Sequence, residues 1–192
     1  MAVQVNNSHP SNLDAAGAML YRNLARQAFM YLNEFRRDPA GHGRQIGLDL
    51  SQVSPRRQLQ WDPILAAAAE EKVYNMGHEN FFGHIDPQGY GMNYRVAHKG
   101  YLLPPAWTEN PAANFIESIA ANSMDPAHFI DQLIIDKGIP GKGHRQHLLG
   151  TSNFYSNSSR IGIAIGYERN STYKYYCCIL IAPRFANVEA PE

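Results

Sequence analysis

Residues 160–182 read RIGIAIGYERNSTYKYYCCILIA and contain the strongest indication of the fold. Two runs rich in β-branched, aromatic and other apolar residues, 160–168 and 173–182, are separated by a short polar turn. This pattern is typical of an antiparallel β-hairpin. Because a lone hairpin is only marginally stable in water, we expect a third strand, near residues 115–121.

The first part of the chain is predicted to be helical. Apolar residues recur at helical spacing over 14–37, with Asp14 as the N-cap and Asp38-Pro39 as the stop. The glycine-rich residues 41–47 are expected to form a connection.

Two further Asp-Pro pairs predict helix starts, because Asp caps a helix and Pro fits its first position. They open predicted helices over 62–75 and 125–136. Shorter helical turns are expected over 93–98 and 144–149, and irregular structure over 77–91. Helices that precede strands along the chain indicate an α+β fold with segregated layers.

The length of 192 residues fits one domain. We assign residues 13–186 to this domain, residues 1–12 to a flexible N-terminal arm, and residues 187–192 to a C-terminal tail. Hydrophobic residues at 44% and charged residues at 18% exclude disordered, collagen-like and coiled-coil classes.

The charge balance and the hydropathy of the chain argue against a nucleic-acid partner and against a membrane span. Seventeen basic and seventeen acidic residues leave no net charge to attract nucleic acid, so no nucleic-acid partner is expected. No stretch approaches 18 apolar residues, so no membrane span is expected. The N-terminal residues lack the basic start and apolar run of a signal peptide.

The only cysteines are the adjacent Cys177 and Cys178. Neighbouring side chains of a strand point to opposite faces, so an ordinary intrachain disulfide is not expected. Secreted proteins without a usable disulfide are common in bacteria.

The chain contains eight histidines, and some of them are candidates for a functional site. His84 ends the run NFFGH, and His144 and His147 lie in GHRQHLL, where a spacing of three puts them on one face of a helical turn. The alternatives are a loop histidine bonded to a carbonyl for His84, and a basic turn or helix cap for the second segment. No HExxH or CxxC motif is present, so a metal site would combine distant segments.

Five ordered motifs carry a resemblance to a known family. They are WDPILAAAA from Trp61, NFFGH from Asn80, either ENPAA from Glu109 or ESIAAN from Glu117, GHRQHLL from Gly143 and RIGIAIG from Arg160. Together they resemble the bacterial branch of the CAP superfamily, which comprises cysteine-rich secretory proteins, antigen 5 and pathogenesis-related proteins. The resemblance covers roughly residues 18–183.

The resemblance implies an α-β-α sandwich with a small antiparallel sheet and a central cleft. Many members place two histidines and two acidic residues there, where a divalent ion such as zinc can bind. The motifs carry these roles to His84, His144 and Asp136, and to either Glu117 or Glu109. We favour Glu117, because its motif keeps the Ile-Ala pair and the short gap to the next helix.

Asp136 departs from the family pattern, since it is one methylene shorter than the usual glutamate, so metal ligation there could pass through water or be lost. Arg145 and His147 are further cleft candidates.

The resemblance also implies an extracellular location and three alternatives for the centre. The first is a non-enzymatic module that binds a small molecule, lipid or protein and can hold a divalent metal. The second is a zinc-dependent hydrolase or protease, in which metal-bound water attacks an ester or amide. The third is a metal-free cluster in which each histidine is oriented by a carboxylate.

Overall fold

The structure is a computed structural model that describes residues 18–184. One five-stranded sheet has the order β1-β4-β5-β3, with β2 also paired to β4. The strands are β1 (Ala18–Leu20), β2 (Gln60–Trp61), β3 (Glu117–Ala121), β4 (Ser158–Glu168) and β5 (Tyr175–Pro183). The helices are α1 (Arg22–Arg37), α2 (Pro39–Gln45), α3 (Pro63–His78), α4 (Met92–His98), α5 (Pro126–Ile135) and α6 (Gly143–Leu149), with 3-10 turns η1 (Pro105–Trp107) and η2 (Pro140–Lys142).

The predicted hairpin and its third strand are confirmed. Strands β4 and β5 pair antiparallel, from Ser158 opposite Pro183 to Tyr167 opposite Tyr175. Strand β3 pairs antiparallel with the other side of β5 and forms an edge of the sheet.

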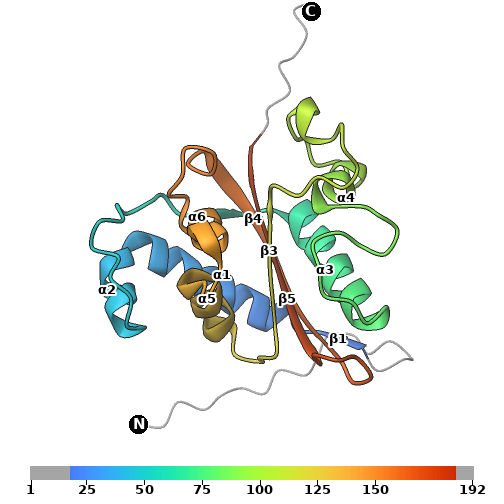
Figure 1. Cartoon of the computed structure of the whole chain (residues 1–192), viewed down its shortest axis with the longest axis horizontal. Coiled ribbons are helices and arrows are strands. Elements are labelled where there is room, and N and C mark those ends of the chain that lie inside the picture. Colours follow the sequence, from blue (N-terminus) through green and yellow to red (C-terminus); the bar gives the residue numbers. More distant parts are fainter. Residues whose placement is uncertain (1–17, 185–192) are drawn as a thin grey trace, which may run out of the picture.

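Helices cover both faces of this sheet, as expected for an α-β-α sandwich (Figure 1). The first face carries α1, α5 and α6 over the α1-side core, which includes Leu32, Phe35, Ile130, Ile161 and Ile179. The second face carries α3 and α4 over the α3-side core, which includes Leu65, Val73, Met76, Tyr176 and Leu180. Burial on both faces explains why β5 is apolar without interruption rather than alternating.

The two adjacent cysteines point to opposite faces of the sheet. Cys177 lies in the α1-side core and Cys178 in the α3-side core, and both are free and fully buried. Burial raises the pKa of both thiols above the ordinary value. Among the described helices, none is both long and apolar enough to cross a membrane.

Both predicted Asp-Pro helix starts are confirmed in atomic detail. The Oδ1 atom of Asp62 accepts hydrogen bonds from the backbone of Ile64 at 2.9 Å and of Leu65 at 3.1 Å. Asp125 caps α5 in the same way, through the backbone N–H of Ala127 at 2.9 Å.

The first helix ends at Arg37, just before Asp38-Pro39, as predicted, but the prediction of its start was wrong. Residues 18–20 form β1, which pairs with the end of β4, and α1 begins only at Arg22. The expected cap Asp14 lies outside the described residues, as do the predicted arm and tail. Asp38 not only ends α1 but also caps α2 through Gly41 N at 2.9 Å, so part of the expected connection is helical.

Candidate functional site

Four predicted residues from four segments meet beside the start of the edge strand β3. Glu117 is the first residue of β3, and His84 lies in the loop between α3 and α4. Asp136 is the C-cap of α5, and His144 is the second residue of α6. The two histidines therefore reach the sheet edge from its opposite faces.

His84 and Glu117 form the first half of this centre. His84 Nδ1 lies 2.7 Å from Glu117 Oε2. The glutamate side chain is fully buried, whereas 42% of the histidine side chain is exposed. A buried carboxylate thus fixes the orientation of an imidazole that still reaches the surface.

His144 and Asp136 form the second half with the same geometry. His144 Nδ1 lies 2.7 Å from Asp136 Oδ1, and the backbone N–H of His144 donates to Oδ2 at 3.0 Å. Asp136 adopts a left-handed conformation, with φ of 51°, which ends α5 and turns the chain towards α6. Lys142 Nζ donates to the Asp136 carbonyl at 2.8 Å and stabilises this turn.

The two rings face each other across the sheet edge, with centroids 6.2 Å apart and planes inclined by 32°. Each ring directs Nδ1 towards a carboxylate, which favours the tautomer with hydrogen on Nδ1. In a neutral ring of this kind Nε2 carries the lone pair and can accept a hydrogen bond or ligate a metal. The centre therefore offers two oriented acceptor nitrogens.

Lys72 and Cys178 are buried side chains that contact the His84–Glu117 half of the centre. Lys72 Nζ donates to the His84 carbonyl at 3.1 Å and lies 3.8 Å from Glu117 Oε1, and the lysine side chain is only 4% exposed. Cys178 Sγ donates to the same Oε1 atom at 3.7 Å. Sequence reasoning missed both residues, although Lys72 shares the apolar face of α3 with Ala69 and Met76, and this spacing signals burial.

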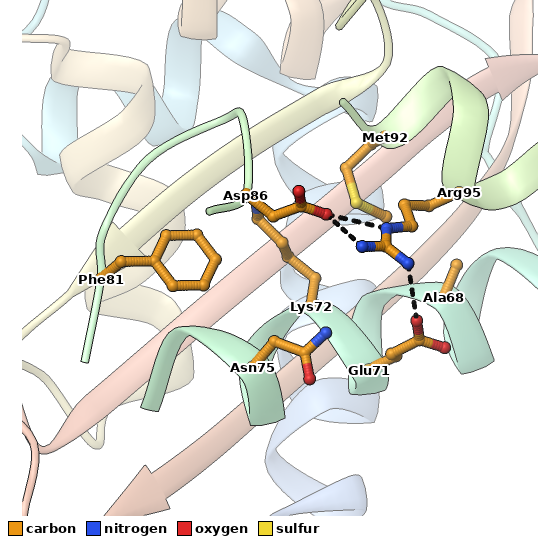
Figure 2. Close-up of a pocket in the computed structure, with 8 residues that line it drawn as sticks. All are labelled: Ala68, Glu71, Lys72, Asn75, Phe81, Asp86, Met92 and Arg95. Atoms are coloured by element: carbon orange, nitrogen blue, oxygen red, sulfur yellow. Dashed lines mark hydrogen bonds and ion pairs between the residues drawn. The ribbon is translucent and has the colours of Figure 1, made fainter. Parts of the chain in front are cut away.

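Beyond His84, the loop is held by Asp86 (Figure 2). Its carboxylate accepts from Arg95 Nε of α4 at 2.8 Å and from the backbone N–H of Gln88 and Tyr90. Burial alone would raise the pKa of Asp86, but these hydrogen bonds outweigh it and hold the pKa below its usual value. Because Arg95 also pairs with Glu71 of α3, the loop that carries His84 is bonded to both helices of this face.

The comparison with known proteins identifies the family. The profile of the cysteine-rich secretory protein family, CAP, matches residues 29–180. The chain belongs to this family. A search of curated proteins found no match.

Two solved structures resemble this CAP domain. An outer surface protein from Borrelia burgdorferi has a TM-score of 0.55 at 13% identity, over 92% of this chain and all of that chain. An extracellular protein with an SCP domain from Bacillus anthracis has a TM-score of 0.49 at 17% identity, over 91% of this chain and 45% of that one. At such identities the first likeness supports the fold alone.

Two other predicted site residues of this CAP domain, Arg145 and Glu109, lie outside the histidine centre. Arg145 donates from Nε to Ile134 O at 2.6 Å and from Nη2 to Ile135 O at 2.9 Å, so its guanidinium caps the end of α5. Glu109 is exposed after η1, and no described contact joins it to either histidine. Of the two candidate glutamates, Glu117 is the one that contacts His84.

His147 lies beneath the centre rather than at its surface. Its Nδ1 is 2.7 Å from Ser118 Oγ and its Nε2 is 3.3 Å from Ile181 O. Burial lowers the pKa of His147 to about 4, and the charge of Arg36 acts in the same direction. This histidine is therefore neutral at physiological pH and packs the CAP domain rather than binding a ligand.

Both carboxylates of the centre are hydrogen-bonded to histidine Nδ1 atoms. Within residues 18–184, no three His, Cys, Asp or Glu side chains form a group that could hold a metal ion by themselves. The carboxylates lie behind the histidines on the Nδ1 side, so the Nε2 atoms are the ring nitrogens left for a ligand.

Proposed function

We propose that this CAP domain is an extracellular, non-enzymatic binding module whose ligand centre is the pair His84 and His144. The observation that carries the proposal is the matched geometry of two imidazoles, each held through Nδ1 by a buried carboxylate at 2.7 Å. Preoriented acceptor nitrogens lose little freedom on binding, which favours capture of a ligand.

A divalent metal such as zinc is the ligand class that this donor set supports best. Neutral imidazole is a common zinc ligand, and a carboxylate bonded to the second ring nitrogen raises its basicity. When bound, zinc would supply Lewis acidity to a molecule that shares its coordination shell. His84 and His144 would hold the ion, and Glu117 and Asp136 would orient them.

The hydrolase alternative receives less support from the same contacts. A hydrolytic centre needs a general base within reach of the attacking water. Both carboxylates of this centre already accept from histidine Nδ1 atoms, and Asp136 also accepts from the His144 backbone. We therefore favour binding over hydrolysis.

Zinc titration tests the proposal. At a free zinc concentration of 100 Kd we expect about 2.7 kcal/mol of stabilisation. This corresponds to a rise in Tm of roughly 5–10 °C for a domain of this size. His84→Ala and His144→Ala should each abolish most of this rise.

His98→Ala is the matched control, because His98 is exposed and stacks on Tyr94 away from the centre. It should leave the zinc response unchanged, and NMR signals of the His84 and His144 rings should shift with zinc. An equal response in all three variants would contradict the proposal.

Asp136→Asn tests the role of the carboxylate behind the metal ligand. The amide keeps the shape of the side chain but loses its charge and one of the two acceptor oxygens that bond His144. We expect zinc affinity to fall about tenfold or more, as is typical when such a partner is changed. Isothermal titration of the variant and the parent protein measures this, and equal affinities would leave Asp136 without the proposed role.

A further inference from the structure

A second hollow lies away from the histidine centre, between the loop that precedes β2 and the loop that precedes β4. Its volume is about 450 Å³, within the range of small-molecule sites. Figure 1 shows the two loops at the same end of the molecule, on the side of α1 and α6. The lining comprises Arg36 at the end of α1, residues 55–58, and residues 156–159.

The charge of this hollow is entirely positive. Three of its lining residues are arginines, Arg36, Arg56 and Arg57, and the remaining ones are proline, glutamine, asparagine and serines. None of the three arginines forms an ion pair within the described part of the chain. A chain with no net charge therefore gathers three unpaired guanidinium groups at one place.

Arg36 is the residue whose position is hardest to explain by folding alone. It is only 3% exposed, and its charge is met by carbonyl oxygens, Leu148 O at 2.6 Å and Arg57 O at 3.4 Å. Burial, and then the neighbouring charge of Arg56, lower the pKa of Arg36 to about 10. A buried charge without an opposite charge costs stability, and a bound anion would offset that cost.

Arg56 supplies an independent observation. Its Nε atom is buried and has no hydrogen-bond partner. Buried donors in native proteins are almost always satisfied, so this atom is a donor at the wall of the hollow that a bound molecule can satisfy. Its backbone N–H donates to Arg36 O at 2.8 Å, which fixes the two arginines side by side.

We propose that this hollow binds a small polar molecule that carries a phosphate or sulfate ester. Guanidinium groups match the oxygens of a tetrahedral oxyanion through paired hydrogen bonds. The serine hydroxyls, Asn157 and Gln58 provide further donors and acceptors for the polar body of the ligand. The volume exceeds the needs of a bare anion, which favours an ester over inorganic phosphate or sulfate.

Titration with defined probes tests the proposal. Glucose 6-phosphate and glucosamine 6-sulfate distinguish a phosphate from a sulfate ester, inorganic phosphate and sulfate represent the bare anions, and glucose is the neutral control. Amide NMR signals of residues 156–159 report binding at the hollow, which separates it from the general stabilisation of proteins by these salts. We expect one ester to shift these signals and to bind at least tenfold more tightly than its inorganic anion.

Arg56→Gln and Arg57→Gln should each weaken this binding about tenfold or more, as expected for a lost charged hydrogen bond. Arg36 is not substituted, because its guanidinium also holds the end of α6. Arg169→Gln is the matched control, since Arg169 is exposed beyond the opposite end of the 11-residue strand β4, about 30 Å away.

Three results would overturn the proposal. They are no shift with either ester, equal binding of an ester and its inorganic anion, and equal losses in Arg56→Gln and Arg169→Gln. None of these results depends on zinc or on the histidine centre, so the two proposals fail separately.

Discussion

At the scale of single residues, histidines of similar sequence context have opposite environments. His84 and His144 keep one nitrogen towards a buried carboxylate while their rings remain partly exposed. His147, three residues after His144, is fully enclosed between Ser118 and Ile181. The α6 helix thus leaves one histidine partly exposed at the sheet edge and uses the next as part of the core.

His147 predicts how stability depends on pH. Its pKa is about 4 in the folded protein and about 6.5 when unfolded, so between these values the unfolded state binds the extra proton. The free energy of unfolding therefore falls as the pH falls through this window. This group should contribute a loss of about 2 kcal/mol between pH 7 and pH 5.

Urea unfolding of the parent protein and of His147→Gln at both pH values measures this contribution. The glutamine can still accept from Ser118 and donate to Ile181 O, but it does not titrate. The variant should lose about 2 kcal/mol less than the parent protein on going from pH 7 to pH 5. The same pH dependence in both proteins would show that His147 is not the responsible group.

At the scale of elements, the packing of α3 against β4 depends on a glycine. A Cβ atom at Gly162 would lie 2.2 Å from both Ala66 N and Leu65 C, which are backbone atoms of α3. Backbone cannot move aside as a flexible side chain can. The glycine therefore sets the close approach of this helix to the sheet and with it the position of Lys72, which holds the His84 loop.

Gly162→Ala is expected to destabilise the domain by about 3 kcal/mol, the upper part of the range for overpacking. For a domain of this size the Tm should fall by roughly 6–12 °C. Gly143→Ala is the control, because a Cβ atom there meets nothing within 4 Å and the residue is already helical. A thermal melt compares the two, and equal effects would contradict the close packing of α3.

At the scale of the whole molecule, two apolar cores share a single sheet. Strands β4 and β5 contribute to both cores, so neither face can unfold without exposing the other side of the same strands. The two tryptophans of the chain report on different faces, because Trp61 packs against the α1-side core and Trp107 against the α3-side core.

Single-tryptophan variants test this cooperativity. In Trp61→Phe and Trp107→Phe, the fluorescence midpoint in denaturant should coincide with the midpoint from far-UV circular dichroism of the same variant. Coincidence in both variants is the expected result for one domain. A fluorescence transition that precedes the loss of secondary structure in either variant would show that the two faces unfold separately.

The sequence by itself determined the elements whose causes are local. The Asp-Pro pairs at residues 62 and 125 start helices, because cap and first turn are neighbours in the chain. The apolar runs around the polar turn near Asn170 form the hairpin for the same reason. At Asp38-Pro39 the predicted end of α1 is confirmed, but the same pair also begins α2, and the prediction missed this second helix.

Only the tertiary structure decided which groups meet. The ordered motifs named His84, Glu117, Asp136 and His144, but their pairing by 2.7 Å contacts required four separate segments to reach the edge of β3. The burial of Lys72, the enclosure of His147 and the unpaired arginines likewise depend on partners distant in the chain. Capping and alternation act over a few residues, whereas the environment of a charge is set by every segment that packs around it.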